Sequence, residues 1–185
     1  HYGEHRTVDS KANVIVDVRV TAGNVSDVTP IPQILRGIQK RFGKMPENFV
    51  LDAAYNAAAI AHILEEYGIQ GVIGHKRFSR KREYYGKWRF EFDPKTNTYI
   101  CPNGKRLRWT NTNREGEREY RSCAEDCRDC PHRAKCYSQK AGGKKVTRHV
   151  WQGALDAITE FTKTPTGQAI YKRRKETIER SFAEA

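Results

Sequence analysis

Apolar and polar residues alternate most regularly near the start of the chain. Val14–Val20 has a period of two, which predicts a strand with its valines buried and with Asp17 and Arg19 on the opposite face. His5–Val8 predicts a second strand, joined to the first through the turn-like residues 9–13. The opening of the chain therefore predicts a β-hairpin.

The following segments predict helices that alternate with buried strands. Helical spacing is shown by five apolar residues that follow Pro30 and precede a stop at Gly43, namely Ile31, Ile34, Leu35, Ile38 and Phe42. Phe49–Leu51 and Ile69–Gly74 are short apolar runs, and a helix capped by Asn56 is expected between them. The order strand, strand, helix, strand, helix, strand predicts an α/β fold in which a hairpin leads into parallel strands.

The amino-acid composition of the chain changes after Gly74. The next residues are basic and aromatic, with short strand-like pieces at Arg89–Phe92, Thr98–Ile100 and Arg106–Trp109. Residues 151–162 and 167–185 are typical of helices. We therefore predict a first part of the core at residues 1–74, a basic, cysteine-bearing insertion at residues 75–150, and C-terminal helices that complete the core at residues 151–185.

Charge is distributed unevenly along the 185 residues. The total is +12, but residues 1–74 carry a net charge of −1, residues 75–121 carry +8 and residues 122–185 carry +5. Such asymmetry favours a polyanionic partner, above all nucleic acid, over a solvated surface that happens to be basic. The candidate phosphate-binding residues lie in one run and are Lys76, Arg77, Arg80, Lys81 and Arg82. The alternative interpretation of this run is a solvated linker.

Four of the five cysteines lie close together, at Cys123, Cys127, Cys130 and Cys136. There is no secretory signal and no apolar run near the roughly 20 residues that span a bilayer, so we expect a cytoplasmic protein without disulfides and without a membrane partner. The two-residue gap between Cys127 and Cys130 is common in structural zinc sites. Zinc and a knuckle of free thiols both remain open, with Cys101, His132 and His149 as alternative ligands.

Two carboxylates are candidates for chemistry. Asp52 closes a buried strand, where α/β sheets form their sites, although such an aspartate also suits a turn or a cap. Glu179 shares a helical face with Tyr171, Lys175 and Phe182. A glutamate between two aromatic rings needs a metal or a basic partner when it is buried, whereas on a surface it would form an ordinary pair with Lys175.

The segments that hold these carboxylates resemble those of DDE-type insertion-sequence transposases. Val50–Tyr55 resembles the strand with the second acidic residue of that family, residues 21–27 resemble the loop upstream of it, and Tyr171–Phe182 is similar to the helix with the final glutamate. Residues 93–105 and the cysteines after them resemble an insertion found in one branch. The resemblance implies a ribonuclease-H-like mixed sheet with flanking helices, interrupted by a small basic cysteine-rich insertion.

The resemblance also implies roles for particular residues. Asp52 and Glu179, 127 residues apart, would be the second and third catalytic carboxylates, supported by Tyr171 and Lys175. Together they would hold Mg²⁺ or Mn²⁺ for DNA strand cleavage and strand transfer. The first aspartate of the family lies on an earlier strand and is not found here, so we expect a C-terminal fragment that is inactive by itself.

Partners follow from the same resemblance. It implies binding to transposon ends and to target DNA, and assembly as a homodimer. Two alternatives to a catalytic transposase remain: a non-catalytic, zinc-ribbon-like DNA-binding module and a decayed transposase remnant without activity. Convergence of Asp52 and Glu179 would favour the enzyme, and closure of the cysteines around a metal with the carboxylates apart would favour the module.

Overall fold

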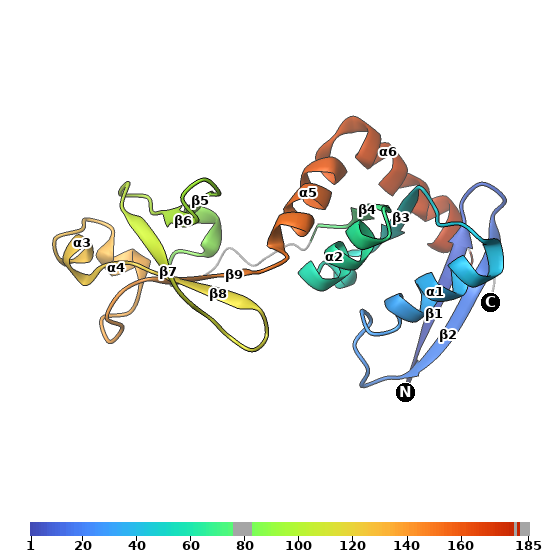
Figure 1. Cartoon of the computed structure of the whole chain (residues 1–185), viewed down its shortest axis with the longest axis horizontal. Coiled ribbons are helices and arrows are strands. Elements are labelled where there is room, and N and C mark those ends of the chain that lie inside the picture. Colours follow the sequence, from blue (N-terminus) through green and yellow to red (C-terminus); the bar gives the residue numbers. More distant parts are fainter. Residues whose placement is uncertain (76–82, 180, 182–185) are drawn as a thin grey trace. The chain divides into compact units, whose positions relative to one another are not determined.

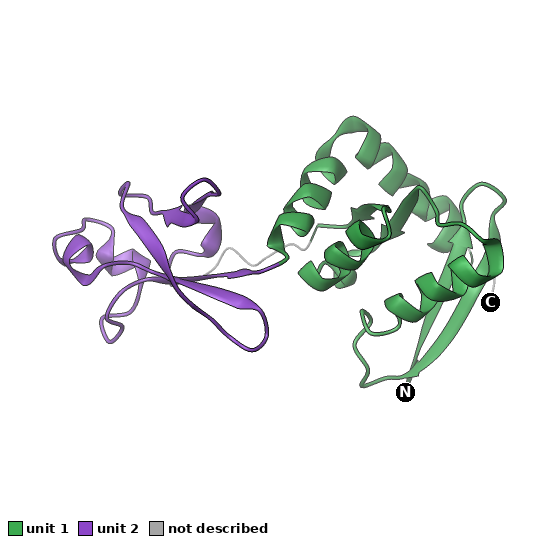
Figure 2. Cartoon of the chain, viewed as in Figure 1, with its two compact units in different colours: residues 1–77, 151–185 green, residues 78–150 purple. Residues whose placement is uncertain are grey.

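The computed structural model describes residues 1–75, 83–179 and 181. The chain forms two compact units (Figure 2), of which unit 1 contains residues 1–77 and 151–185 and unit 2 contains residues 78–150. Helices and strands occur in both, so the predicted mixture of α and β structure is confirmed. Among the described residues, no helix has the length and apolar character that crossing a membrane requires.

Unit 1 begins with the predicted hairpin, seen in blue in Figure 1. Strands β1 (Tyr2–Asp9) and β2 (Val14–Ala22) pair antiparallel, with a register shift at Thr7/Val8. The turn between them contains Asn13 at a φ of 55°, a left-handed conformation that asparagine tolerates better than most residues do. Both strands were predicted, and both extend beyond their predicted bounds.

The prediction for the two faces of β2 was wrong. Val14, Val18 and Val20 are at least half exposed, whereas Asp17 is only 6% exposed. Helix α1 (Ile31–Phe42) explains the reversal, because Arg41 of that helix forms an ion pair with Asp17, and Arg19 donates to both Asp17 and the carbonyl of Gln33. A period of two reveals that two faces differ, but a helix that carries a complementary charge decides which face is covered.

Helix α1 agrees with its predicted bounds and with four of its five predicted apolar positions, while Phe42 is 51% exposed. Pro30 is the N-cap, Pro32 lies in the first turn, and Gly43 ends the helix at a φ of 67°. Proline suits a first turn because the backbone N–H that it lacks has no partner there, and glycine suits the left-handed end because it has no Cβ. The buried residues of the helix are Ile31, Ile34, Leu35 and Ile38.

Two parallel strands follow as β3 (Asn48–Leu51) and β4 (Gln70–Ile73), with Leu51 opposite Ile73. They are joined through a short 3-10 turn, η1 (Ala53–Tyr55), and helix α2 (Ala58–Glu66). The predicted cap at Asn56 was wrong. Ala57 stands at that position, and the Asn56 amide instead donates to the carbonyl of Gly74 at 3.3 Å, so its role is to tie the η1 turn to the end of β4.

The C-terminal part of unit 1 contains helices α5 (Gln152–Lys163) and α6 (Pro165–Arg174), drawn in orange and red in Figure 1. Leu155 and Ile158 of α5 belong to the same core as α1, α2, β3 and β4. Ile158 lies so close to Gly71 of β4 that a side chain there would overlap it. Residues far apart in sequence thus build one core.

A π-helical turn, η3 (Lys175–Glu179), follows α6 directly. The prediction of one α-helical face through Tyr171, Lys175 and Glu179 was therefore wrong, since a π-turn widens the helix and shifts every later side chain around its axis. Phe182, the fourth residue of that predicted face, lies outside the described residues.

Unit 2 is built on an antiparallel sheet of five consecutive strands. Its elements, in chain order, are the 3-10 turn η2 (Lys87–Arg89), β5 (Glu91–Asp93), β6 (Thr98–Ile100), β7 (Arg106–Thr112), β8 (Glu117–Arg121), the short helices α3 (Ala124–Arg128) and α4 (Arg133–Cys136), and β9 (Lys145–His149). The predicted strand at Arg89–Phe92 was displaced, because its first residue belongs to η2. Strands β8 and β9 were not predicted, since their polar residues mask the alternation.

The three sheets of the structure are separate. The hairpin β1–β2, the pair β3–β4 and the sheet of unit 2 share no backbone ladder within the described residues. Unit 2 also has its own small core, which consists of Phe90, Tyr99, Leu107, Tyr120, Cys136 and Val146. The order of elements predicted for residues 1–74 is confirmed, while the single mixed sheet that the resemblance implied is not present in the described part of the chain.

Candidate active site

Asp52 lies where β3 ends, at the edge where the parallel strand β4 also ends. Its Oδ1 atom accepts a hydrogen bond of 2.7 Å from the backbone of Ala54, so it is the N-cap of η1. The capping interpretation is therefore correct, but it uses only one of the two oxygens. The side chain is 40% exposed, which leaves Oδ2 available to a second partner.

That second partner is Arg174, the last residue of α6. Its Nη2 lies 3.6 Å from Oδ2 of Asp52, and its Nη1 lies 3.2 Å from Oε1 of Glu179. One guanidinium thus lies between two carboxylates that are 127 residues apart in sequence. Glu179 therefore pairs with Arg174 and not with Lys175, which was the alternative for a surface helix. The π-turn η3 connects Arg174 to Glu179.

Tyr171 and Lys175 differ in their relation to this site. The Tyr171 hydroxyl lies so close to Gly74 that a side chain at Gly74 would overlap it, and the backbone nitrogen of Ala53 is beside the same point. Tyr171 therefore lies at the shared end of β3 and β4, next to Asp52. Lys175 is exposed at the start of η3, and no contact connects it to either carboxylate within the described part of the chain.

A chain of polar side chains lies on the other side of η1. The Tyr55 hydroxyl is 3.1 Å from Nδ1 of His5, whose Nε2 is 3.0 Å from the Thr21 hydroxyl. Burial raises the pKa of Tyr55 to about 12, and the negative charges of Asp27 and Asp52 contribute while Arg174 opposes them. Tyr55 is therefore a neutral hydrogen-bonding group at ordinary pH, and it links the site to the hairpin.

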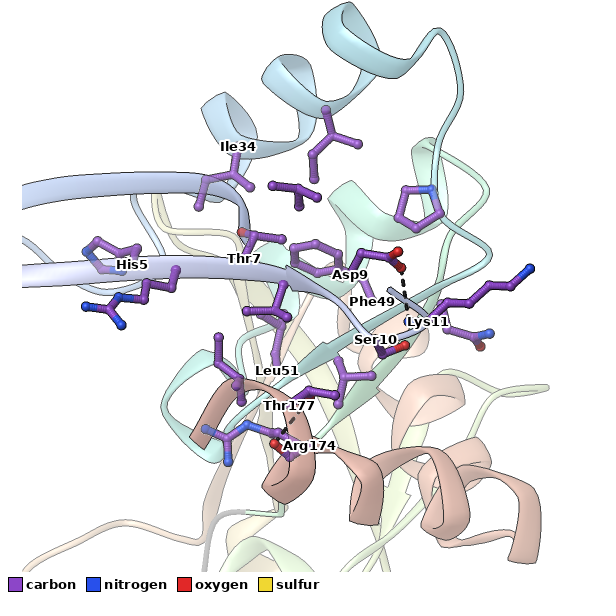
Figure 3. Close-up of a pocket in the computed structure, with 18 of the residues that line it drawn as sticks. His5, Thr7, Asp9, Ser10, Lys11, Ile34, Phe49, Leu51, Arg174 and Thr177 are labelled. Atoms are coloured by element: carbon purple, nitrogen blue, oxygen red, sulfur yellow. Dashed lines mark hydrogen bonds between the residues drawn. The ribbon is translucent and has the colours of Figure 1, made fainter. Parts of the chain in front are cut away.

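A cavity of about 700 Å³ is lined by Asp52 and Arg174, among other residues (Figure 3). Consecutive residues from Glu4 of β1 to Lys11 of the following turn line one side of it, and consecutive residues from Asn48 to Asp52 line another. Since neighbouring residues of a strand point to opposite faces, an unbroken run of lining residues means that strand edges border the space. The hairpin and the parallel pair thus turn open edges toward one cavity.

Four of the five cysteines line one small cavity in unit 2. They are Cys101, Cys127, Cys130 and Cys136, while Cys123 is exposed and lines no part of it. Burial raises the pKa of the Cys136 thiol, and the charges of the other three contribute, against an opposing effect of Lys144. Within residues 1–75, 83–179 and 181, however, no three His, Cys, Asp or Glu side chains are positioned to hold a metal ion.

Basic side chains of unit 2 gather on one face of its sheet. Arg108, Arg121 and Lys145 lie opposite one another in register across β7, β8 and β9, and all three are exposed. Glu119 accepts from both Arg121 and Lys145, and the hydrogen bond from Lys145 is the main reason that its pKa is lowered. The predicted phosphate-binding run at residues 76–82 lies outside the described residues.

Comparison with known proteins matches residues 100–185 to a family described as the transposase DDE domain. The match supports a relation to DDE-type transposases. The resemblance to DDE-type transposases is thereby confirmed. No curated protein and no solved structure matches this chain significantly.

The matched part of the chain includes Glu179, Tyr171 and all five cysteines, while Asp52 lies before it. A transposase DDE domain implies an enzyme family that cuts and joins DNA strands. The sequence analysis did not select Arg174, Tyr55 or His5. Arg174 was one of four adjacent basic residues, and only the π-turn makes its five-residue separation from Glu179 a contact.

Proposed function

We propose that this chain supplies two of the catalytic carboxylates of a DNA transposase that performs metal-dependent strand cleavage and strand transfer. The observation that carries the proposal is the shared contact of Asp52 and Glu179 with Arg174. Two carboxylates that share one cation repel each other, and the positive charge of Arg174 offsets that repulsion here. Here the two residues are also those singled out by the family resemblance.

The donor set fits a hard divalent cation. Carboxylate oxygens are the ligands that Mg²⁺ and Mn²⁺ prefer, and Asp52 and Glu179 would hold the ion with the oxygens that now face Arg174. When bound, such ions supply electrostatic stabilisation to the attacking and leaving oxygens of a phosphodiester. Within the chain itself, Ala54 orients Asp52, and Tyr171 packs where β3 and β4 end, so both act as positioning groups.

A third carboxylate is required by the family resemblance, and the large cavity of unit 1 offers a place for the strand that would carry it. Strands β1 and β3 border that cavity with their edges, and unpaired edges are templates for another strand. A strand between them would join the two small sheets into one mixed sheet of ribonuclease-H type, interrupted by unit 2. It would end beside Asp52 if it ran parallel to β3.

DNA contact is the role that we propose for the basic residues. The run Lys76, Arg77, Arg80, Lys81 and Arg82 stays a candidate from its sequence, and the row of Arg108, Arg121 and Lys145 offers a second group of exposed cations. Such groups bind phosphates without reading sequence and lose affinity as salt rises. Assembly as a homodimer on paired transposon ends is part of the same proposal.

Metal-directed cleavage of the protein tests the proposal without requiring a complete enzyme. Fe²⁺ bound in place of Mg²⁺, with ascorbate and peroxide, is expected to cut the backbone near residues 52 and 179. Asp52→Asn and Glu179→Gln should each weaken metal binding by about tenfold or more, since even residues that only support metal ligands have effects of that size. Mass spectrometry of the fragments locates the cuts.

Asp9→Asn is the matched control. Asp9 lines the same cavity, but its oxygens accept from the backbone of Lys11 and Ala12 in the hairpin turn. Its replacement should leave the cuts near residues 52 and 179 unchanged. Salt-dependent DNA binding without such cuts would instead favour the non-catalytic DNA-binding module, and neither activity would favour the decayed remnant.

Arg174→Gln is expected to tighten Mn²⁺ binding. The guanidinium and the metal compete for the same carboxylate oxygens, so its removal should lower the Mn²⁺ dissociation constant by about two- to tenfold, as two partly exposed ion pairs would allow. Electron paramagnetic resonance of free Mn²⁺ measures this constant. Arg173→Gln removes the same charge from an adjacent residue that contacts the carbonyl of Ser10 instead, and equal effects of both substitutions would contradict the competition.

A further inference from the structure

The thiols of unit 2 converge from three separate parts of the chain. Cys101 follows β6, Cys127 and Cys130 belong to the region of α3, and Cys136 ends α4. All four line a cavity of about 20 Å³, which is room for one water-sized particle. His132 lines this cavity as well, but its Nδ1 lies 3.2 Å from the Tyr85 hydroxyl. Four thiols around a space of that size have the composition of a structural zinc site.

Local backbone geometry holds these cysteines in tight turns. The carbonyl of Cys101 accepts from Gly104, and the amide of Cys101 donates to Lys105, both at 2.8 Å. Gly104 has a φ of 71°, which favours glycine because a Cβ would be strained there. Cys127 and Cys130 are joined by a wider turn, in which the Cys130 amide donates to Cys127 at 3.5 Å.

Positive charge lies close to the same thiols. The Lys144 ammonium donates to the carbonyl of Cys136 at 3.1 Å, and Arg133 also lines the cavity. Four thiolates around one divalent ion leave a net charge of −2, and neighbouring cations stabilise thiolates. The small core of unit 2 gives a physical reason for a metal, because a unit of this size buries little apolar surface and is often stabilised by one.

We propose that Cys101, Cys127, Cys130 and Cys136 bind one structural Zn²⁺ ion and that Cys123 does not take part. Cys123 is exposed at the start of α3 and is outside the cavity, although it is the neighbour of Cys127 in sequence. No three candidate ligands of the described residues are arranged to hold an ion, so zinc binding would draw the four thiols together as they lose their protons.

Zinc content distinguishes this ligand set from one that contains Cys123. The whole chain, purified under reducing conditions and equilibrated with Zn²⁺, should retain one zinc per chain after gel filtration, measured by elemental mass spectrometry. Cys123→Ser should retain it as well, whereas Cys101→Ser should retain none. Loss of zinc in Cys123→Ser, retention in Cys101→Ser, or absence of zinc from the unmodified chain would each overturn the proposal.

Alkylation of the unmodified chain provides a second measurement that does not depend on a variant folding. With zinc bound, iodoacetamide should modify Cys123 rapidly and the other four cysteines slowly, and a chelator should make all five reactive. Protection of Cys123 or rapid modification of Cys101 in the zinc-bound chain would overturn the ligand set. The outcome is independent of the carboxylate site in unit 1, so either proposal can fail without the other.

Discussion

Replacing Tyr120 with Ala is expected to unfold unit 2. Tyr120 is completely buried, it contacts the rings of Tyr99 and Phe92, and its hydroxyl donates to Asn97 at 2.7 Å. Removal of a buried aromatic side chain costs about 3–5 kcal/mol in well-packed cores. Among the described residues, the core of this unit has six buried members, so a loss of that size is comparable to its whole stability.

Hydrogen exchange followed by mass spectrometry measures each unit of the chain separately. In Tyr120→Ala we expect protection to be lost in β6–β9 and retained in α2 and β4, because the two units have separate cores. Tyr120→Phe is the matched control, since it removes only the hydrogen bond to Asn97, worth about 1 kcal/mol. Equal loss of protection in both variants, or equal loss in both units, would contradict this account.

Replacing Gly167 with Ala should displace helix α6 and with it the candidate active site. Gly167 lies in the first turn of α6, where its amide donates to the Thr164 hydroxyl, and a Cβ there would lie 2.8 Å from the Cα of Thr162 and still closer to the Phe161 carbonyl oxygen. Because these are backbone atoms of α5, the two helices must move apart. Overpacking of this kind costs about 1–3 kcal/mol.

The displacement should also affect function, because α6 carries Tyr171 and Arg174 and leads into Glu179. We expect Gly167→Ala to lower the midpoint of denaturant unfolding of unit 1 and to abolish Fe²⁺-directed cuts near residue 179. Gly153→Ala makes the same chemical change in α5, where nothing lies within 4 Å of the new Cβ. It should be neutral or stabilising by up to about 1 kcal/mol, and a matching loss in that variant would exclude close packing as the cause.

Local patterns in the sequence determined the elements of residues 1–74. The bounds of α1 follow from Pro30, Gly43 and four apolar residues at helical spacing, all of which act within a single turn or a single face. The short apolar runs that became β3 and β4 were equally visible, because strands covered on both faces need no alternation. Asp52 could be selected for the same reason, as the polar residue that ends such a run.

Tertiary structure decided what those patterns do not encode. Arg41 of α1 made Asp17 the buried residue of β2, against its period-two prediction. Cys101 lies 22 positions before Cys123, yet the path of β6 and β7 brings Cys101 and not Cys123 to the cavity. Arg174 met both carboxylates only through a π-turn, so contacts between distant residues depend on the path of the backbone, which local spacing does not determine.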